Sequence, residues 1–382
     1  MGSISFMENE KYIWLKDTVK NFVEAEIPRE YARSIDGKDQ YPHELIKKVG
    51  ELGLLGINVS SEYGGMGGNV VDVMILYEEV SKRLPVLAWT LGNVTLYGNE
   101  IISVNGSEEQ KNTYLPRLVK GELLFSFALT EPDAGSDAAN IKTSAVYKEG
   151  CYLINGNKMF ISGGGVSDVT VTMARTEKSR YGGITSFLVD CKSEGYKATS
   201  IKKLGYNGSD TCEVFYDDVP VMPRDILGGE ESLNKGWMQM MNTLNGERLA
   251  LSACALGIGQ AVIDDIISFA SKNYDFNNFA NQNLQHRIVE MATELESARQ
   301  LAYNAAWMET NHKECTKETS MSKYYATETA KKIAMGGMDL MGEYGALEET
   351  DMQRYLRDVL ILTIGGGTTQ IQKNIVAKTM GL

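Results

Sequence analysis

The spacing of apolar residues divides the chain into three parts. In the first third, apolar residues recur every three or four positions in the runs 14–27, 43–56 and 70–84, and this spacing predicts helices. From about Leu124 the pattern changes to short β-rich runs separated by turn residues. From about Glu230 helical spacing returns and continues nearly to the end. The chain is therefore expected to be an α+β protein of several domains.

The middle part predicts a hairpin and further strands. The run 144–162 reads as two strands joined by a Glu149-Gly150 turn, and three more strand-like runs follow at 168–175, 184–190 and 211–219. Pro220 and Pro223 mark the exit from this part. In the last part, the run 236–270 predicts one long helix or two close ones, and the runs 284–310 and 320–341 predict two more. We place the domains at 1–123, 124–228 and 229–382.

Composition and charge exclude some classes of protein. The hydrophobic content of 43% and charged content of 23% are ordinary for a globular protein. The net charge of −12 argues against nucleic acid as the main partner, because a phosphate backbone needs a basic surface. No apolar run approaches the roughly 18 residues of a membrane span and no signal-peptide pattern opens the chain, so we expect no membrane association and a cytoplasmic location.

Few residues are suited to metal binding or nucleophilic catalysis. The five cysteines are scattered without a Cys-x-x-Cys pair, which disfavours structural zinc and a disulfide framework and suits a reducing cytosol. The three histidines lie in no HExxH motif and beside no plausible nucleophile. We therefore expect no metal site. The chemistry must come from carboxylates, from the backbone or from a cofactor.

Glu247 is a carboxylate in an apolar stretch. In one interpretation it is a helix-end charge or a partner of Arg248. In the other it is a base whose pKa is raised by apolar surroundings. Periodicity alone leaves both open.

Three other stretches combine glycines with polar groups. They are "FALTEPDAGSD" at 127–137, "KMFISGGG" at 158–165 and "LTIGGGTTQIQ" at 362–372. Three successive glycines, Gly365 to Gly367, indicate that the backbone closely approaches another group there. No GxxxxGK[ST] and no strand-linked GxGxxG is present, so P-loop and Rossmann interpretations both fail.

Together these stretches resemble the acyl-CoA dehydrogenase family, over essentially the whole chain. "SEYGGMGG", then "LTEPDAGSD" with "LINGNKMFISGG", then "RYLRD" and "GGGTTQIQ" occur in the family's order. The resemblance implies an N-terminal helical domain, a middle β-barrel domain and a C-terminal four-helix bundle. It also implies FAD, with the isoalloxazine ring between the β domain and the bundle.

The resemblance assigns cofactor contacts residue by residue. Phe160 stands where many relatives have Trp, and Ser162 replaces the usual Thr that contacts flavin N5. The full set of implied cofactor contacts is Phe127, Leu129, Thr130, Gly135, Ser136, Phe160, Ile161, Ser162, Gln282, Asp339, Gly342, Thr368 and Gln370.

The resemblance also indicates which side chain of other family members is missing at the glycines 365–367. Many relatives carry the catalytic Glu at the position of Gly366. A subset similar to isovaleryl- and long-chain acyl-CoA dehydrogenases and crotonobetainyl-CoA reductase takes this base from a Glu-Arg-Leu motif on a bundle helix, which here is Glu247-Arg248-Leu249. Glu247 is thus expected to remove the α-proton of an acyl thioester, while the Gly366 N–H binds the thioester carbonyl. The implied substrate contacts are Ser136, Asn245, Arg248 and Gly367.

Two departures from the family pattern affect the phosphate end of the cofactor site. The usual Arg-x-x-Phe-Gly is absent at 273–277, and Asp339 and Glu343 place acids near the expected phosphates. Three hypotheses remain: a flavoenzyme that oxidises an acyl thioester or reduces its enoyl form, one subunit of a heteromeric dehydrogenase, and a thioester-binding protein with little FAD. The resemblance further implies an acyl-CoA or acyl-carrier-protein thioester, electron-transfer flavoprotein as electron partner, and a homotetramer (a dimer of dimers) or a heteromer.

Overall fold

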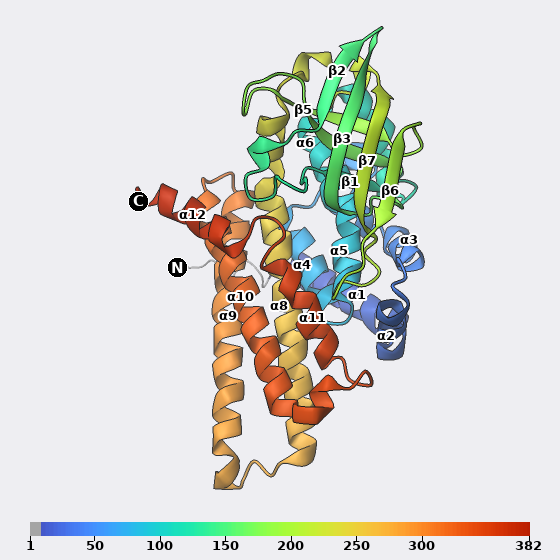
Figure 1. The fold of residues 1–382 in the computed structure, drawn as a ribbon. Coiled ribbons are helices and arrows are strands. Elements are labelled where there is room, and N and C mark those ends of the chain that lie inside the picture. Colours follow the sequence, from blue (N-terminus) through green and yellow to red (C-terminus); the bar gives the residue numbers. More distant parts are fainter. Residues whose placement is uncertain (1–8) are drawn as a thin grey trace.

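The computed structural model describes residues 9–382. Figure 1 shows the β domain at one end of the molecule, the long helices of the bundle extending away from it, and the N-terminal helices packed beside α8. The predicted sequence of a helical part, a β part and a helical bundle is confirmed.

The N-terminal part is helical and largely buried. The predicted helices at 14–27, 43–56 and 70–84 are confirmed as α1, α3 and α4, although α3 ends at Glu51 and a 3₁₀ turn follows. Helix α4 packs against α8, and an Asn69–Asp72 capping box fixes its start. The elements are α1 (Glu10–Glu26), α2 (Arg29–Lys38), α3 (His43–Glu51), α4 (Val70–Ser81), α5 (Pro85–Val94), the π-helical turn η4 (Thr95–Glu100), α6 (Ile101–Asn105) and α7 (Glu108–Val119).

The middle part is one seven-stranded curled sheet. The predicted hairpin is confirmed: β2 and β3 pair antiparallel, and Glu149 (φ 52°) and Gly150 (φ 95°) form the turn between them. A two-residue loop in which both residues have positive φ matches the right-handed twist of the two strands that it joins. The strands are β1 (Phe125–Ala128), β2 (Ser144–Lys148), β3 (Cys151–Ser162), β4 (Val169–Arg175), β5 (Ile184–Asp190), β6 (Tyr196–Ser200) and β7 (Thr211–Val221), paired in the order β1-β4-β2-β3-β7-β6 with β5 on β4.

The C-terminal part is built around one long helix, α8 (Gly236–Asn273). Of the two possibilities left open for 236–270, the single helix is correct. By length and composition α8 is apolar enough to cross a membrane, with a mean hydropathy of 1.5 over 18 residues. The sequence analysis, which expected no apolar run of that length, did not anticipate this. However, 78% of that window is buried inside the protein, as in a core helix. The other helices are α9 (Gln282–Thr310), α10 (Thr316–Met341), α11 (Met352–Leu362) and α12 (Thr369–Thr379).

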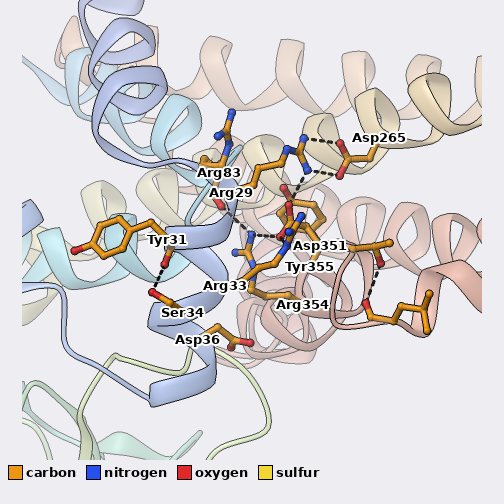
Figure 2. A network of polar contacts seen from close by, with 12 residues as sticks. Arg29, Tyr31, Arg33, Ser34, Asp36, Arg83, Asp265, Asp351, Arg354 and Tyr355 are labelled. Carbon is orange, nitrogen blue, oxygen red and sulfur yellow. Dashed lines mark hydrogen bonds and ion pairs between the residues drawn. The ribbon is translucent and has the colours of Figure 1, made fainter.

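An ion-pair network joins the N-terminal helices to the bundle (Figure 2). The guanidinium of Arg29 on α2 donates to Asp265 on α8 at 2.6 and 2.8 Å and to Asp351 at 2.7 Å. Asp351, which is buried, also accepts from Arg33 and Arg354. Buried charges persist in proteins when they are paired in this way. Arg354, the first residue of the "RYLRD" motif, thus belongs to a network that connects α2 to the bundle.

Candidate active site

Glu247 lies on α8, and its side chain lines a narrow cavity together with Phe127 of the β domain. Burial raises the pKa of the Glu247 carboxyl above its ordinary value, while the charges of Arg248 and Lys323 and a hydrogen bond from Tyr97 partly offset this. The cavity walls come from η4, α6, β1 and α8, with the residues Leu96, Tyr97, Glu100, Ile101, Phe127, Met240, Thr243, Leu244 and Glu247.

The Gly365–Gly367 turn faces the same carboxyl. Gly366 has φ +62°, and a Cβ atom built on it would stand 2.4 Å from Leu251 Cδ1 and 3.9 Å from Glu247 Oε1. A side chain at 366 would therefore be strained and would collide with α8. The positive φ favours glycine at 366, a side chain there would displace the end of Leu251, and the Glu247 carboxylate lies beside the space that such a side chain would enter.

Side chains from two helices hold the carbonyls of this turn. Lys323 Nζ on α10 donates to the Gly367 carbonyl at 2.7 Å, and Gln372 Nε2 on α12 donates to the Gly366 carbonyl at 2.9 Å. Burial lowers the pKa of Lys323 to about 8, against the opposing attraction of Glu247. Within residues 9–382 the Gly366 N–H has no acceptor. The turn is thus fixed while one backbone donor is free to bind a ligand.

A buried ion pair shapes the "LTEPDAGSD" loop. Lys158 Nζ donates to Glu131 Oε1 and to the Leu129 carbonyl, both at 2.9 Å. Glu131 also accepts from the backbone N–H groups of Lys142 (2.6 Å) and Thr143 (2.9 Å). Burial opposes ionisation, but Lys158 and these hydrogen bonds hold the pKa of Glu131 below its ordinary value. The sequence analysis missed this pair; its only signal was a lysine inside a strand.

The end of β3 presents an aromatic side chain and a hydroxyl. Phe160 has φ +61° and its side chain is 64% exposed, although it is a large apolar group. Two positions later, Ser162 Oγ accepts a hydrogen bond from the Trp89 indole N–H at 2.9 Å. On the other wall, Phe127 stacks with Tyr97 at a centroid distance of 5.9 Å. An exposed aromatic surface beside an oriented hydroxyl fits a flat, hydrogen-bonding ring such as the flavin of FAD.

The other predicted site residues fall into two groups. Thr368 caps α12 by accepting from the Ile371 N–H at 3.2 Å, and the β-domain positions Leu129, Thr130, Gly135 and Ser136 lie in the loop after β1. By contrast, Gln282, Asp339 and Gly342 belong to the start of α9 and the end of α10, at the end of the bundle away from the β domain (Figure 1). One chain therefore does not bring these three to the cavity.

The environments of the remaining positions differ. Ile161 is buried in the β-domain core and Gln370 is exposed. Asn245 donates to Glu309 at 3.0 Å. Arg248 is only 5% exposed, and its Nε atom has no partner among residues 9–382. Within that range no group of three His, Cys, Asp or Glu side chains is placed to hold a metal ion.

Comparison with known proteins identifies the family. Models of the acyl-CoA dehydrogenase N-terminal, middle and C-terminal domains match residues 9–122, 126–219 and 234–381. The chain is 36% identical to an acyl-CoA dehydrogenase of Bacillus subtilis, over 97% of both chains. It is 34% identical to the caffeyl-CoA reductase-Etf complex subunit CarC of Acetobacterium woodii, over 97% of this chain and 98% of that one.

The fold agrees with this result. The structure of butyryl-CoA dehydrogenase from Megasphaera elsdenii superimposes with a TM-score of 0.92 at 30% identity, covering 97% of this chain and 98% of that one. Members of the family are FAD-dependent and dehydrogenate acyl thioesters or reduce their enoyl forms. The three-part fold, the carboxylate beside the glycine turn and these similarities together show that the chain belongs to the acyl-CoA dehydrogenase family.

Proposed function

We propose that Glu247 is the acid–base group of an FAD-dependent oxidoreductase that dehydrogenates an acyl-CoA thioester or reduces the corresponding enoyl-CoA. The supporting observation is the geometry at the glycine turn, where Glu247 Oε1 lies 3.9 Å from the point at which a Cβ on Gly366 would stand. The Glu247 carboxylate extends from α8 toward the space that a side chain at position 366 would occupy.

The residues of this chain supply binding and proton transfer. The raised pKa of Glu247 suits a base that takes the α-proton in one direction and returns it in the other. The free N–H of Gly366 donates to the thioester carbonyl, a contribution of about 3 kcal/mol to stabilising the enolate. When bound, FAD supplies the hydride chemistry at the β-carbon.

Residues of the β domain and of the glycine turn would hold the flavin. Phe127, Leu129 and Thr130 line one side, Phe160 and Ser162 another, and the remaining contacts are Gly135, Ser136, Ile161, Thr368 and Gln370. Phe160 would be covered by the ring, which accounts for an apolar side chain that is 64% exposed. Ser136, Asn245, Arg248 and Gly367 would contact the thioester.

The distant residues Gln282, Asp339 and Gly342 would serve the cofactor of a second copy. Large apolar side chains are exposed in the adjoining segments, between α8 and α9 and after α10: Tyr274 41%, Phe279 81%, Tyr344 51% and Leu347 45%. Such a group of exposed apolar residues is typical of a subunit interface. It supports an interface between copies of the chain, which we propose assemble as a homotetramer, a dimer of dimers.

A partner and a location complete the proposal. The relative CarC is named as a subunit of a complex with Etf. We extend this to electron-transfer flavoprotein as the electron partner of the present chain, which would work in the cytoplasm.

The test combines purification with an anaerobic flavin assay. The protein expressed alone should contain one FAD per chain, and butyryl-CoA or a longer acyl-CoA should bleach the flavin absorbance. Glu247→Gln should retain FAD and slow bleaching by about 10²–10⁴-fold, the usual contribution of a general base. The control Glu109→Gln, at an exposed position on α7, should behave as wild type. Bleaching of Glu247→Gln at the wild-type rate would exclude this base.

A further inference from the structure

Glu100 is a second carboxylic acid in the cavity that contains Glu247. It is the last residue of the π-helical turn η4, and Tyr97 of the same turn also lines the cavity. π-Helical turns in proteins are often found at functional sites. The sequence analysis did not select Glu100, and the chemistry assigned to Glu247 does not use it.

Glu100 approaches α8 at the residue before the base. A Cβ atom built on Gly246 would stand 2.2 Å from Glu100 Oε1 and 2.7 Å from its Cδ, so this approach requires a glycine. Gly246 and Glu247 are consecutive, and their Cα atoms are about 3.8 Å apart. Glu100 and Glu247 line the same narrow cavity, so a ligand in that cavity would meet both carboxyl groups.

Glu100 has no polar partner in the part of the chain that the structure describes. Among residues 9–382 it makes no hydrogen bond and no ion pair, and the charged groups that act on it, Glu247 and Glu309, are both acidic. Burial, followed by these two neighbours, raises the pKa of Glu100 to about 8. A largely buried polar group without a partner is costly, so its retention needs an explanation. Its position on a cavity wall indicates that the partner comes with the substrate.

The rest of the wall defines what that partner can be. Apart from the two acids, Tyr97 and Thr243, the cavity is lined by apolar side chains: Leu96, Ile101, Phe127, Met240 and Leu244. A carboxylate chain end would lose its hydration in this apolar cavity and would find no cation among the lining residues. A hydrogen-bond donor fits, because a carboxyl group offers an acceptor oxygen in both protonation states.

We propose that Glu100 determines substrate specificity, selecting acyl chains that carry a hydrogen-bond donor, a hydroxyl or an ammonium group, a few bonds beyond the α-carbon. This inference rests on the function proposed above. It assigns the substrate class as short polar acyl thioesters and excludes chains that end in a carboxylate.

The experiment measures binding of four enoyl thioesters to the oxidised holoenzyme, through the change in flavin absorbance. Crotonyl-, trans-4-hydroxycrotonyl-, trans-4-aminocrotonyl- and fumaryl-CoA share one carbon skeleton and end in methyl, hydroxyl, ammonium and carboxylate groups. The wild type should bind the hydroxyl or the ammonium ester at least about tenfold more tightly than crotonyl-CoA, in the range of a buried hydrogen bond to an ionisable group. Fumaryl-CoA should bind most weakly.

Three variants assign any preference to Glu100. Glu100→Leu should reduce the preference to less than about twofold, and Glu100→Gln, which keeps an acceptor oxygen, should retain the hydroxyl preference and lose the ammonium preference. The surface control Glu109→Gln should reproduce the wild-type ratios. Because affinities are compared within one variant, its total activity does not enter the result.

Two outcomes would overturn the inference, and a third would end it together with the proposed function. Equal wild-type affinity for crotonyl-CoA and both polar esters, with butyryl-CoA still bleaching the flavin, removes the role of Glu100 and leaves the proposed function intact. A preference that survives Glu100→Leu does the same. Failure of every acyl-CoA to bleach the oxidised flavin, together with failure of every enoyl-CoA to reoxidise the reduced flavin, contradicts the proposed function itself.

Discussion

The conformation of Gly366 predicts the cost of restoring a side chain at that position. Gly366 has φ +62°, where an alanine is destabilised by about 1–2 kcal/mol relative to its preferred conformations. Its new methyl group would stand 2.4 Å from Leu251 Cδ1, closer than van der Waals contact, and overpacking of this kind costs about 1–3 kcal/mol. Gly366→Ala should therefore destabilise the protein by about 2–5 kcal/mol.

A double-mutant cycle separates the two terms. Leu251→Ala alone removes a buried side chain and should cost about 2–5 kcal/mol, but it also clears the space that the new methyl group needs. In that background Gly366→Ala should cost only the backbone term, so the coupling between the two positions should be about 1–3 kcal/mol. Urea unfolding of the four proteins, followed by circular dichroism, measures it.

The result bears on why the base lies on α8. A cost of Gly366→Ala below about 0.5 kcal/mol, or a cost that Leu251→Ala does not reduce, would refute the reasoning from the glycine turn. In that case neither backbone conformation nor Leu251 would keep a side chain out of position 366.

Three further predictions concern other groups of the site. Lys158→Met removes the cation paired with the buried Glu131 and should cost about 3–5 kcal/mol in urea unfolding, whereas Lys142→Met, which breaks an exposed pair, should cost less than about 1 kcal/mol. Trp89→Phe removes the hydrogen bond to the Ser162 hydroxyl, which we propose contacts the flavin. It should shift the visible absorbance maximum of bound FAD with a stability loss of about 1 kcal/mol or more; an unchanged spectrum would contradict contact between that hydroxyl and the ring. The pKa of Glu100 is raised by burial from 4.5 to about 8, so the folded state keeps a proton that the unfolded chain loses, and stability should fall as pH rises from about 4.5 to 8. Glu100→Gln should reduce that fall in thermal melts, and an unchanged pH profile would contradict it.

The elements that could be predicted from the sequence are those determined by residues close together in the chain. The Glu149-Gly150 turn is recognisable because both residues tolerate or favour the backbone that a tight hairpin needs, and their φ angles are 52° and 95°. The long helix α8 follows from continuous helical spacing of apolar residues. Strand β6 (Tyr196–Ser200) was not predicted, because only Tyr196 and Ala198 of its five residues pack against the core, and so short a run resembles a loop.

The site residues also divide into those indicated by a local sequence pattern and those brought together only by the fold. Glu247 was selected because a carboxylate in an apolar run is unusual, and the match to a family motif gave it a role. Glu100 was missed because its contact with Gly246 joins segments far apart in the chain, and no local pattern reports it. The Trp89–Ser162 hydrogen bond spans 73 residues and was missed for the same reason. Packing between domains creates these contacts, so only the structure reveals them.

Exchange of the substrate α-proton tests the role of Glu247 most directly. A 3-thiaacyl-CoA carries sulfur at the β-position, so it cannot transfer a hydride, and any loss of its α-protons in D₂O reports proton abstraction alone. Mass spectrometry should show rapid deuterium incorporation with the wild type and incorporation at least about 100-fold slower with Glu247→Gln. Equal rates for the two proteins would place the base elsewhere and contradict the account.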